Sequence, residues 1–197
     1  MTNMNIVVLD IETQNTFAMV ESNNPVDLDM SIMCTYESKT QKYESYGLDD
    51  LPKLWPVLEN ADILVTFNGM HFDLPILNKY YSGDLTKFRH IDLLKEVQKV
   101  IGRRVGLDNI ASSTLGVGKT GNGLEAITWW KNGEVDKIIE YCKADVKVTK
   151  DVYEYAKKNN ALYYMDGTEK RSVPLDTSSW EKKQSDTDSR ITYSLPF

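Results

Sequence analysis

The sequence predicts an α/β fold, and three features of the chain indicate it. Residues 6–12, Ile-Val-Val-Leu-Asp-Ile-Glu, form an apolar run ending in two acids, which is typical of a buried β-strand. A second apolar run covers residues 63–67. From Asp92 onward apolar residues recur mainly at helical spacing, so the second half of the chain is expected to be mostly helical.

Taken in order, the strands alternate with polar segments. The chain is polar from 15 to 24, which predicts a loop, and two strand-like segments then follow, joined through Ser38, Lys39 and Thr40. A short strand is expected just before Asp92. The five strands are predicted at 6–12, 29–36, 41–46, 63–67 and 88–91.

The helices are predicted from apolar residues three or four positions apart. In the first helix Leu51, Leu54 and Leu58 follow this spacing, and Asp49 or Asp50 is the expected N-cap. The six helices are predicted at 49–59, 74–81, 92–101, 107–115, 124–132 and 135–158.

The C-terminal region has a different composition. Residues 161–165 and 170–174 flank Asp166-Gly167, a turn sequence that predicts a β-hairpin. From Thr177 polar residues prevail and Trp180 is an isolated apolar residue, which predicts a flexible tail. The expected division is a catalytic-type domain at 1–160, a hairpin extension at 161–176 and a tail at 177–197.

Composition sets limits on the class of protein. A hydrophobic content of 41% and a charged content of 26% in 197 residues are those of a soluble globular domain, and no apolar run is long enough to cross a bilayer. The net charge of −6 argues against an indiscriminate nucleic-acid binder with a broad basic surface. Only Cys34 and Cys142 are present, so a disulfide framework is not expected and a cytoplasmic location fits.

Four acids and one tyrosine are the candidate functional residues. Alternate side chains of a strand share a face, so Asp10 and Glu12 project together, and Asp73 follows the apolar run at 63–67. Tyr141 and Asp145 are four residues apart in a helical pattern and share one helix face. Clustered carboxylates repel one another unless cations neutralise them, which indicates a Mg²⁺ or Mn²⁺ site for phosphoryl chemistry.

These residues form three ordered motifs, D-x-E, N-x3-F-D and Y-x3-D, within residues 6–159. The second motif is the specific one because the chain has only 5 Phe. The set resembles the DEDD superfamily of 3′–5′ exonucleases, in its tyrosine (DEDDy) branch, and especially the proofreading domain of family B DNA polymerases and its small stand-alone relatives. The histidine branch places a His at the position of Glu140, so the tyrosine branch is favoured.

The resemblance implies a ribonuclease H-like mixed sheet whose first three strands are antiparallel, flanked by helices. It also implies two divalent cations, Mg²⁺ or Mn²⁺, with Asp10 bridging both, Glu12 and Asp145 completing one site and Asp73 holding the second ion. Tyr141 would orient the attacking water or the scissile phosphate, because a phenol is a poor base at neutral pH. The implied reaction releases nucleoside monophosphates from the 3′ end of single-stranded DNA or RNA, with DNA favoured.

Several further residues are candidates for contact with the substrate, and some of them have a second interpretation. Thr13 and Phe72 adjoin the acids and are expected to bind substrate. Asn68 orders the turn before Asp73 or contacts the terminal nucleotide, and His71 faces substrate or solvent. The residue Lys119 either touches a phosphate or is a solvated lysine, and Trp129 and Trp130 either stack on bases or pack, of which packing is expected.

Two other functions stay open beside the exonuclease. A catalytically silent nucleic-acid-binding or scaffold module would keep the fold without turnover, but such derivatives usually lose a ligand position. An exonuclease subunit could instead act with a separate polymerase or helicase, since the chain contains neither polymerase nor motor motifs. No membrane partner is expected.

Overall fold

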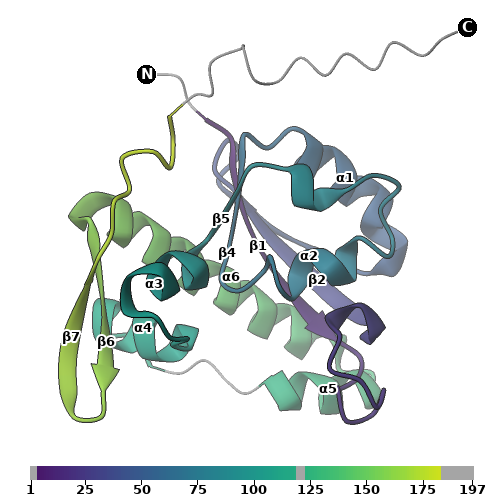
Figure 1. Ribbon diagram of the computed structural model, residues 1–197. Helices are drawn as coiled ribbons and strands as arrows, with labels where there is room; N and C mark the ends of the chain where they lie inside the picture. The colour runs from purple at the N-terminus through teal and green to yellow at the C-terminus, as the bar shows by residue number, and fades with distance from the viewer. Residues whose placement is uncertain (1–3, 119–122, 183–197) are drawn as a thin grey trace, which may run out of the picture.

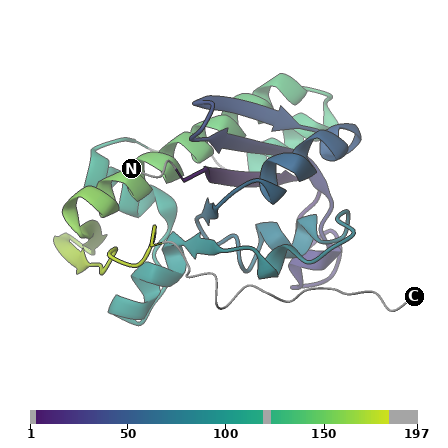
Figure 2. The same cartoon turned by 90° about the horizontal axis from the view of Figure 1, so that it is seen from above.

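A single mixed β-sheet forms the centre of the molecule, in a computed structural model that describes residues 4–118 and 123–182. The strand order is β3-β2-β1-β4-β5 (Figures 1 and 2). The strands β1, β2 and β3 are antiparallel neighbours, and β4 runs parallel to both β1 and β5. The strands are β1 (Ile6–Thr13), β2 (Met30–Glu37), β3 (Lys42–Tyr46), β4 (Ile63–Thr66) and β5 (His90–Asp92). The predicted fold class is confirmed.

Alternate residues of the central strand β1 face two different hydrophobic clusters. Val7 and Leu9 belong to one cluster, whereas Val8 belongs to the other. Both faces are therefore covered, which explains why the strand is a continuous apolar run. Asp10 and Glu12 share the parity of Val8 and so point to the same side of the sheet.

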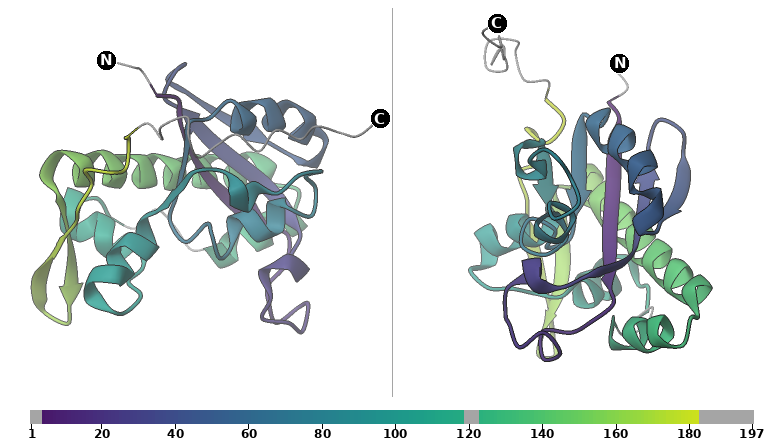
Figure 3. Two further views of the ribbon diagram at one scale, coloured as in Figure 1. Left: turned by 45° about the horizontal axis from the view of Figure 1, so that its top comes forward. Right: turned by 90° about the vertical axis from the view of Figure 1, so that its right-hand side faces the viewer.

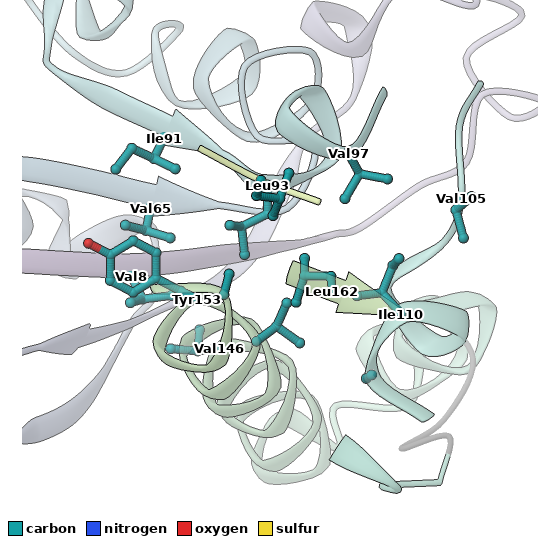
Figure 4. Packing of buried hydrophobic residues seen from close by; sticks show 14 of the residues in the cluster. Val8, Val65, Ile91, Leu93, Val97, Val105, Ile110, Val146, Tyr153 and Leu162 are labelled. Carbon is teal, nitrogen blue, oxygen red and sulfur yellow. The ribbon is translucent and has the colours of Figure 1, made fainter. Parts of the chain in front are cut away.

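The long helix α6 (Val135–Asn159) packs on the Val8 side of the sheet. Its buried residues lie mostly three or four positions apart, as a helix with one apolar face requires. Figure 4 shows Val146 and Tyr153 of this helix beside Val8 and Val65. The neighbouring helices α3 (Leu93–Ile101), α4 (Leu107–Leu115) and α5 (Gly123–Lys131) also contribute residues to this cluster.

The other face of the sheet is covered by α1 (Leu51–Glu59) and α2 (Asp73–Leu77). The helix α2 is shorter than the prediction of 74–81. The chain leaves the helix at Asn78, whose carboxamide oxygen accepts a hydrogen bond from the backbone amide of Leu85 at 2.9 Å. The three 3-10 helices of the described chain are Pro25–Asp27, Leu48–Asp50 and Leu85–Lys87.

The hairpin of β6 (Ala161–Asp166) and β7 (Glu169–Pro174) turns at Gly167, which has a positive φ of 64°. Figure 3 shows it beside the C-terminal part of α6. Leu162 and Val173 are fully buried in the same cluster as Val8. The hairpin therefore extends the hydrophobic cluster on the Val8 side of the sheet.

Trp180 is not an isolated residue, which corrects our expectation for this part of the predicted tail. It is only 5% exposed, and its ring stacks on Tyr153 with centroids 5.5 Å apart and an interplanar angle of 9°. Arg89 donates hydrogen bonds to the carbonyl oxygens of Ser179 and Trp180. Removing a large aromatic side chain from water and packing it on an apolar helix face lowers the free energy of the folded state. Residues 183–197 of the predicted tail lie outside the described chain.

Candidate metal centre

Three carboxylates meet between β1 and α6. Asp10, Glu12 and Asp145 each offer an oxygen, and these oxygens all lie within 4.8 Å of one another. They meet because the Asp10–Glu12 face of β1 packs against the helix that carries Asp145. A divalent metal ion can bind to three oxygens at such separations. This acidic triad could therefore hold a divalent cation.

Asp73 is a fourth acid beside this triad. It is the first residue of α2, only 3% exposed, and its charge raises the pKa of both Asp10 and Glu12. Within the described part of the chain, its Oδ1 atom is buried without a hydrogen-bond partner. A buried oxygen of this kind is costly unless it is paired, and a cation would supply such a partner.

The carboxylates shift one another's pKa upward. Burial, followed by the charge of Asp73, raises the pKa of Asp10 well above its ordinary value. Burial and then Asp145 raise the pKa of Glu12 to about 8, and burial raises that of Asp73 to about 7. Without a cation the cluster therefore resists full ionisation. All of the donors are hard oxygens, which suit Mg²⁺ or Mn²⁺, so the residues fit a divalent-ion site.

Tyr141 lies one helical turn before Asp145 on α6. Burial, followed by the nearby charges of Asp145 and Glu12, raises the pKa of its phenol above the ordinary value, and a hydrogen bond to Asp145 adds to this rise. The hydroxyl is therefore protonated at neutral pH and acts as a donor. Trp129 of α5 packs edge-on against the Tyr141 ring, with centroids 6.1 Å apart. Sequence reasoning expected Trp129 to pack but did not identify its partner.

A largely apolar cleft of about 370 Å³ opens beside Glu12. Thr13 and Phe72, both predicted to bind substrate, line this cleft. The rings of Phe72 and Phe17 meet edge to face at 6.3 Å. Of the residues that line the cleft, sequence reasoning named Glu12, Thr13 and Phe72 and missed the others. Among these, Phe17 could have been signalled by its apolar character in an otherwise polar segment.

Asn68 and His71 lie in the turn between β4 and α2, and neither is among the residues that line the cleft. His71 is exposed. Asn68 has a left-handed backbone with φ of 73°, and its carboxamide oxygen accepts a hydrogen bond from Arg104 at 2.8 Å. Lys119 lies outside the described residues.

The fold and the acid cluster define an α/β domain with a candidate divalent-metal centre. A family model described as the RNase_H superfamily matches residues 7–157, most of the chain, and the chain therefore belongs to that superfamily. Most members of this superfamily are nucleases, so hydrolase activity is plausible on family grounds.

One solved structure similar to this chain is the family B DNA polymerase from the hyperthermophilic archaeon Pyrobaculum calidifontis. The TM-score is 0.58 and the sequence identity 15%, over 78% of this chain and 24% of the polymerase. At this identity the likeness concerns the fold, and the chain spans about a quarter of the polymerase. A search of curated proteins found no match. None of the described helices is long and apolar enough to cross a bilayer.

Proposed function

We propose that the chain is a metal-dependent 3′–5′ exonuclease that hydrolyses phosphodiester bonds at the 3′ end of single-stranded nucleic acid. The observation that carries the proposal is the meeting of Asp10, Glu12 and Asp145, with Tyr141 one helical turn before Asp145 on α6. The polarity of the reaction rests on the resemblance of the three motifs to DEDDy exonucleases. The products are nucleoside monophosphates.

Four carboxylates serve as metal ligands in this proposal: Asp10, Glu12, Asp73 and Asp145. When bound, two divalent cations supply the Lewis acidity that an in-line displacement at phosphorus needs. The residues Asp10 and Glu12 are held in place by β1, which pairs with β2 at both positions and with β4 at Ile6–Val8. Because the ligands sit on a rigid strand and two helices, little reorganisation accompanies binding.

Tyr141 orients rather than removes a proton. Its phenol stays protonated at neutral pH because burial and the surrounding acids oppose the charged form. Its hydroxyl has one proton, so it can donate to a phosphate oxygen, or donate to Asp145 while it accepts a hydrogen bond from the attacking water. A fixed donor next to the acids limits the orientations that a water molecule can adopt there.

The terminal nucleoside occupies the cleft beside Glu12. Phe17 and Phe72 present aromatic surface to a base, and such stacking tolerates any base. Thr13, at the end of β1, lines the same cleft and would lie beside the sugar of this nucleoside. Whether the space next to Thr13 admits a 2′-hydroxyl therefore decides whether the enzyme accepts RNA as well as DNA. We propose DNA as the favoured substrate. The turn residues Asn68 and His71 and the residue Lys119 are proposed to contact the strand outside this cleft.

A labelled-strand assay tests the proposal. A 5′-labelled oligonucleotide with Mg²⁺ or Mn²⁺ should give a ladder of successively shorter labelled products, and Asp10→Ala and Asp145→Ala should abolish it. Glu140→Ala is the matched control, because Glu140 is exposed on the same helix one residue before Tyr141. Cleavage that persists in Asp10→Ala, or no cleavage by the wild-type protein with either ion, contradicts the proposal.

The fold likeness to a polymerase segment supports a supplementary role as an exonuclease subunit that acts with a separate polymerase or helicase. We propose that residues 1–160 carry the catalysis in either case, with 161–176 as a hairpin extension and 177–197 as a tail. Co-purification of the full chain from its native cells tests for such a partner.

A further inference from the structure

The turn before Asp73 is held rigidly by one buried acid. The carboxylate of Asp92, 3% exposed, accepts hydrogen bonds from the backbone amides of Asn68 at 2.9 Å and Met70 at 3.1 Å. The same carboxylate caps α3 through the amides of Leu94 and Lys95. The turn and the start of α3 therefore behave as one rigid unit.

Two cations point at this turn. Arg104 donates a hydrogen bond from Nη2 to the Asn68 carboxamide at 2.8 Å, and Lys95 Nζ lies 3.5 Å from the Met70 sulfur. Both are exposed, and among the described residues neither forms an ion pair with a carboxylate. Asn68 is a neutral acceptor, so it orients the guanidinium and leaves its charge uncompensated.

Two neighbours, Val105 in the chain and Asn68 in space, constrain the position of Arg104. The next residue, Val105, is buried in the hydrophobic cluster that contains Val8, and this burial anchors the connection between α3 and α4. The left-handed backbone of Asn68 turns its side chain to meet the guanidinium. An arginine whose fork is already oriented loses less side-chain entropy when it binds a phosphate.

The turn also connects these cations to the acid centre. It begins at Asn68, next to Arg104, and ends at Phe72, which lines the cleft, directly before Asp73, whose charge raises the pKa of Asp10. The five residues 68–72 span at most about 17 Å, so Arg104 is within reach of a single-stranded nucleic acid whose 3′ end lies in the cleft. The acid centre by itself repels a phosphate backbone, and the net charge of −6 adds to this repulsion.

We propose that Arg104, oriented by Asn68 and assisted by Lys95, binds the sugar–phosphate backbone of the single strand just ahead of its terminal nucleotide. This proposal rests on the proposed function, because it assumes that the strand ends in the cleft beside Glu12. It assigns to Arg104 the electrostatic attraction that offsets the acidic surroundings of the site. The contact reads phosphate and not base, so it is independent of sequence.

Strand binding without turnover tests the contact. Fluorescence anisotropy of a short 5′-labelled oligothymidylate is measured with Ca²⁺ in place of Mg²⁺ between 50 and 200 mM salt, and the strand is checked for integrity on a gel. Arg104→Gln should weaken binding roughly three- to tenfold and lower the salt slope by about 0.7, the value for one lost contact to a single strand. Arg104→Lys should restore the slope but not the full affinity, because it keeps the charge and loses the fork.

A variant of Asn68 separates the orientation of the Arg104 guanidinium from its charge, and a variant of Arg171 serves as the control. Asn68→Gly keeps the positive φ and removes the amide, so it should weaken binding about two- to threefold with an unchanged salt slope. Arg171→Gln is the matched control, since Arg171 is exposed and already paired with Asp166 and Glu169. It should bind as the wild type does.

The inference is overturned if Arg104→Gln binds the oligonucleotide with the same affinity and salt slope as the wild type. It is also overturned if Arg104→Gln and Arg171→Gln lose equal affinity, or if the wild-type protein does not bind the oligonucleotide. The proposed function is judged separately by the cleavage ladder. A protein that binds through Arg104 but never cleaves with Mg²⁺ or Mn²⁺ contradicts the exonuclease and leaves the phosphate contact standing.

Discussion

Asp92 holds the backbone of Asn68, 24 positions earlier in the chain, through a 2.9 Å hydrogen bond from the Asn68 amide to Oδ1 of Asp92. The same carboxylate accepts bonds from three more amides, two of them at the start of α3. One buried side chain therefore satisfies a helix end and a turn together. This turn leads directly into Asp73.

Removing that carboxylate should destabilise the fold. Asp92→Ala leaves four amides without their acceptor, and the expected loss in free energy of unfolding is roughly 2–4 kcal/mol. Asp92→Asn keeps one oxygen and should lose about half as much. Urea unfolding at pH 7 in EDTA measures both. Asp84→Ala, which removes the cap of a three-residue 3-10 helix, is the control and should cost about 1 kcal/mol or less. An Asp92→Ala protein as stable as the wild type contradicts the account.

Gly69 should not tolerate a side chain. A Cβ atom at this position would lie 2.4 Å from Oγ1 of Thr66, a fully buried residue whose β-branched side chain cannot turn away. Gly69→Ala is expected to cost about 2–3 kcal/mol of stability. Gly47→Ala is the control, because the nearest atom to its added Cβ is 4.0 Å away. Equal melting temperatures for the two variants would show that the turn adjusts freely.

Local patterns predicted the elements that carry the acids because periodicity determines which face a residue occupies. The period-two spacing of Asp10 and Glu12 and the four-residue spacing of Tyr141 and Asp145 each placed a pair on one face. That the two faces meet depends on packing between residues more than a hundred positions apart. The family resemblance, rather than periodicity, pointed to this meeting.

Other features depend on contacts that no local pattern contains. Trp180 is buried because it meets Tyr153, and the polar residues around it gave no sign of this. The helix α2 ends at Leu77, and the next residue, Asn78, accepts a hydrogen bond from the Leu85 amide, a contact outside the local pattern. Arg104 is one of two adjacent arginines, and its pairing with Asn68 follows from where α3 ends rather than from its own sequence.

The stability of the metal-free protein should fall as the pH rises. Burial and neighbouring acids raise the pKa of Glu12 to about 8 and that of Asp73 to about 7, both above their ordinary values near 4. The folded state then holds more protons than the unfolded state between about pH 4 and pH 8, so its stability is greatest at the lower end and is lost toward pH 8. Chemical unfolding in EDTA at pH 5 and pH 8 measures this.

Glu12→Gln tests the cause of that pH dependence. The variant cannot ionise at this position, so it should be more stable than the wild type at pH 8 in EDTA, by on the order of 1–3 kcal/mol, and similar at pH 5. Saturating Mg²⁺ or Mn²⁺ should reverse the order at pH 8, because only the wild type gains the full binding energy. The same pH slope in both proteins, measured in EDTA, would count against mutual repulsion among the acids.

Tyr141→Phe should lower turnover without loosening metal binding. The loss of an oriented hydroxyl next to the reacting groups typically lowers kcat by roughly 10- to 100-fold, while KM for the strand stays within about twofold. Tyr155→Phe, on the same helix, is the control and should leave kcat unchanged. An unaltered kcat in Tyr141→Phe would remove the orienting role.

Direct counting of bound Mn²⁺ by electron paramagnetic resonance or calorimetry tests the central claim, that these acids form a divalent-metal centre. Two ions should bind per wild-type chain, more tightly at pH 8 than at pH 6 because protons must leave the raised carboxyl groups first. Asp10→Asn should bind no ion tightly, and Asp73→Asn should keep one. A wild-type protein that binds Mn²⁺ no better than Asp10→Asn would contradict the account.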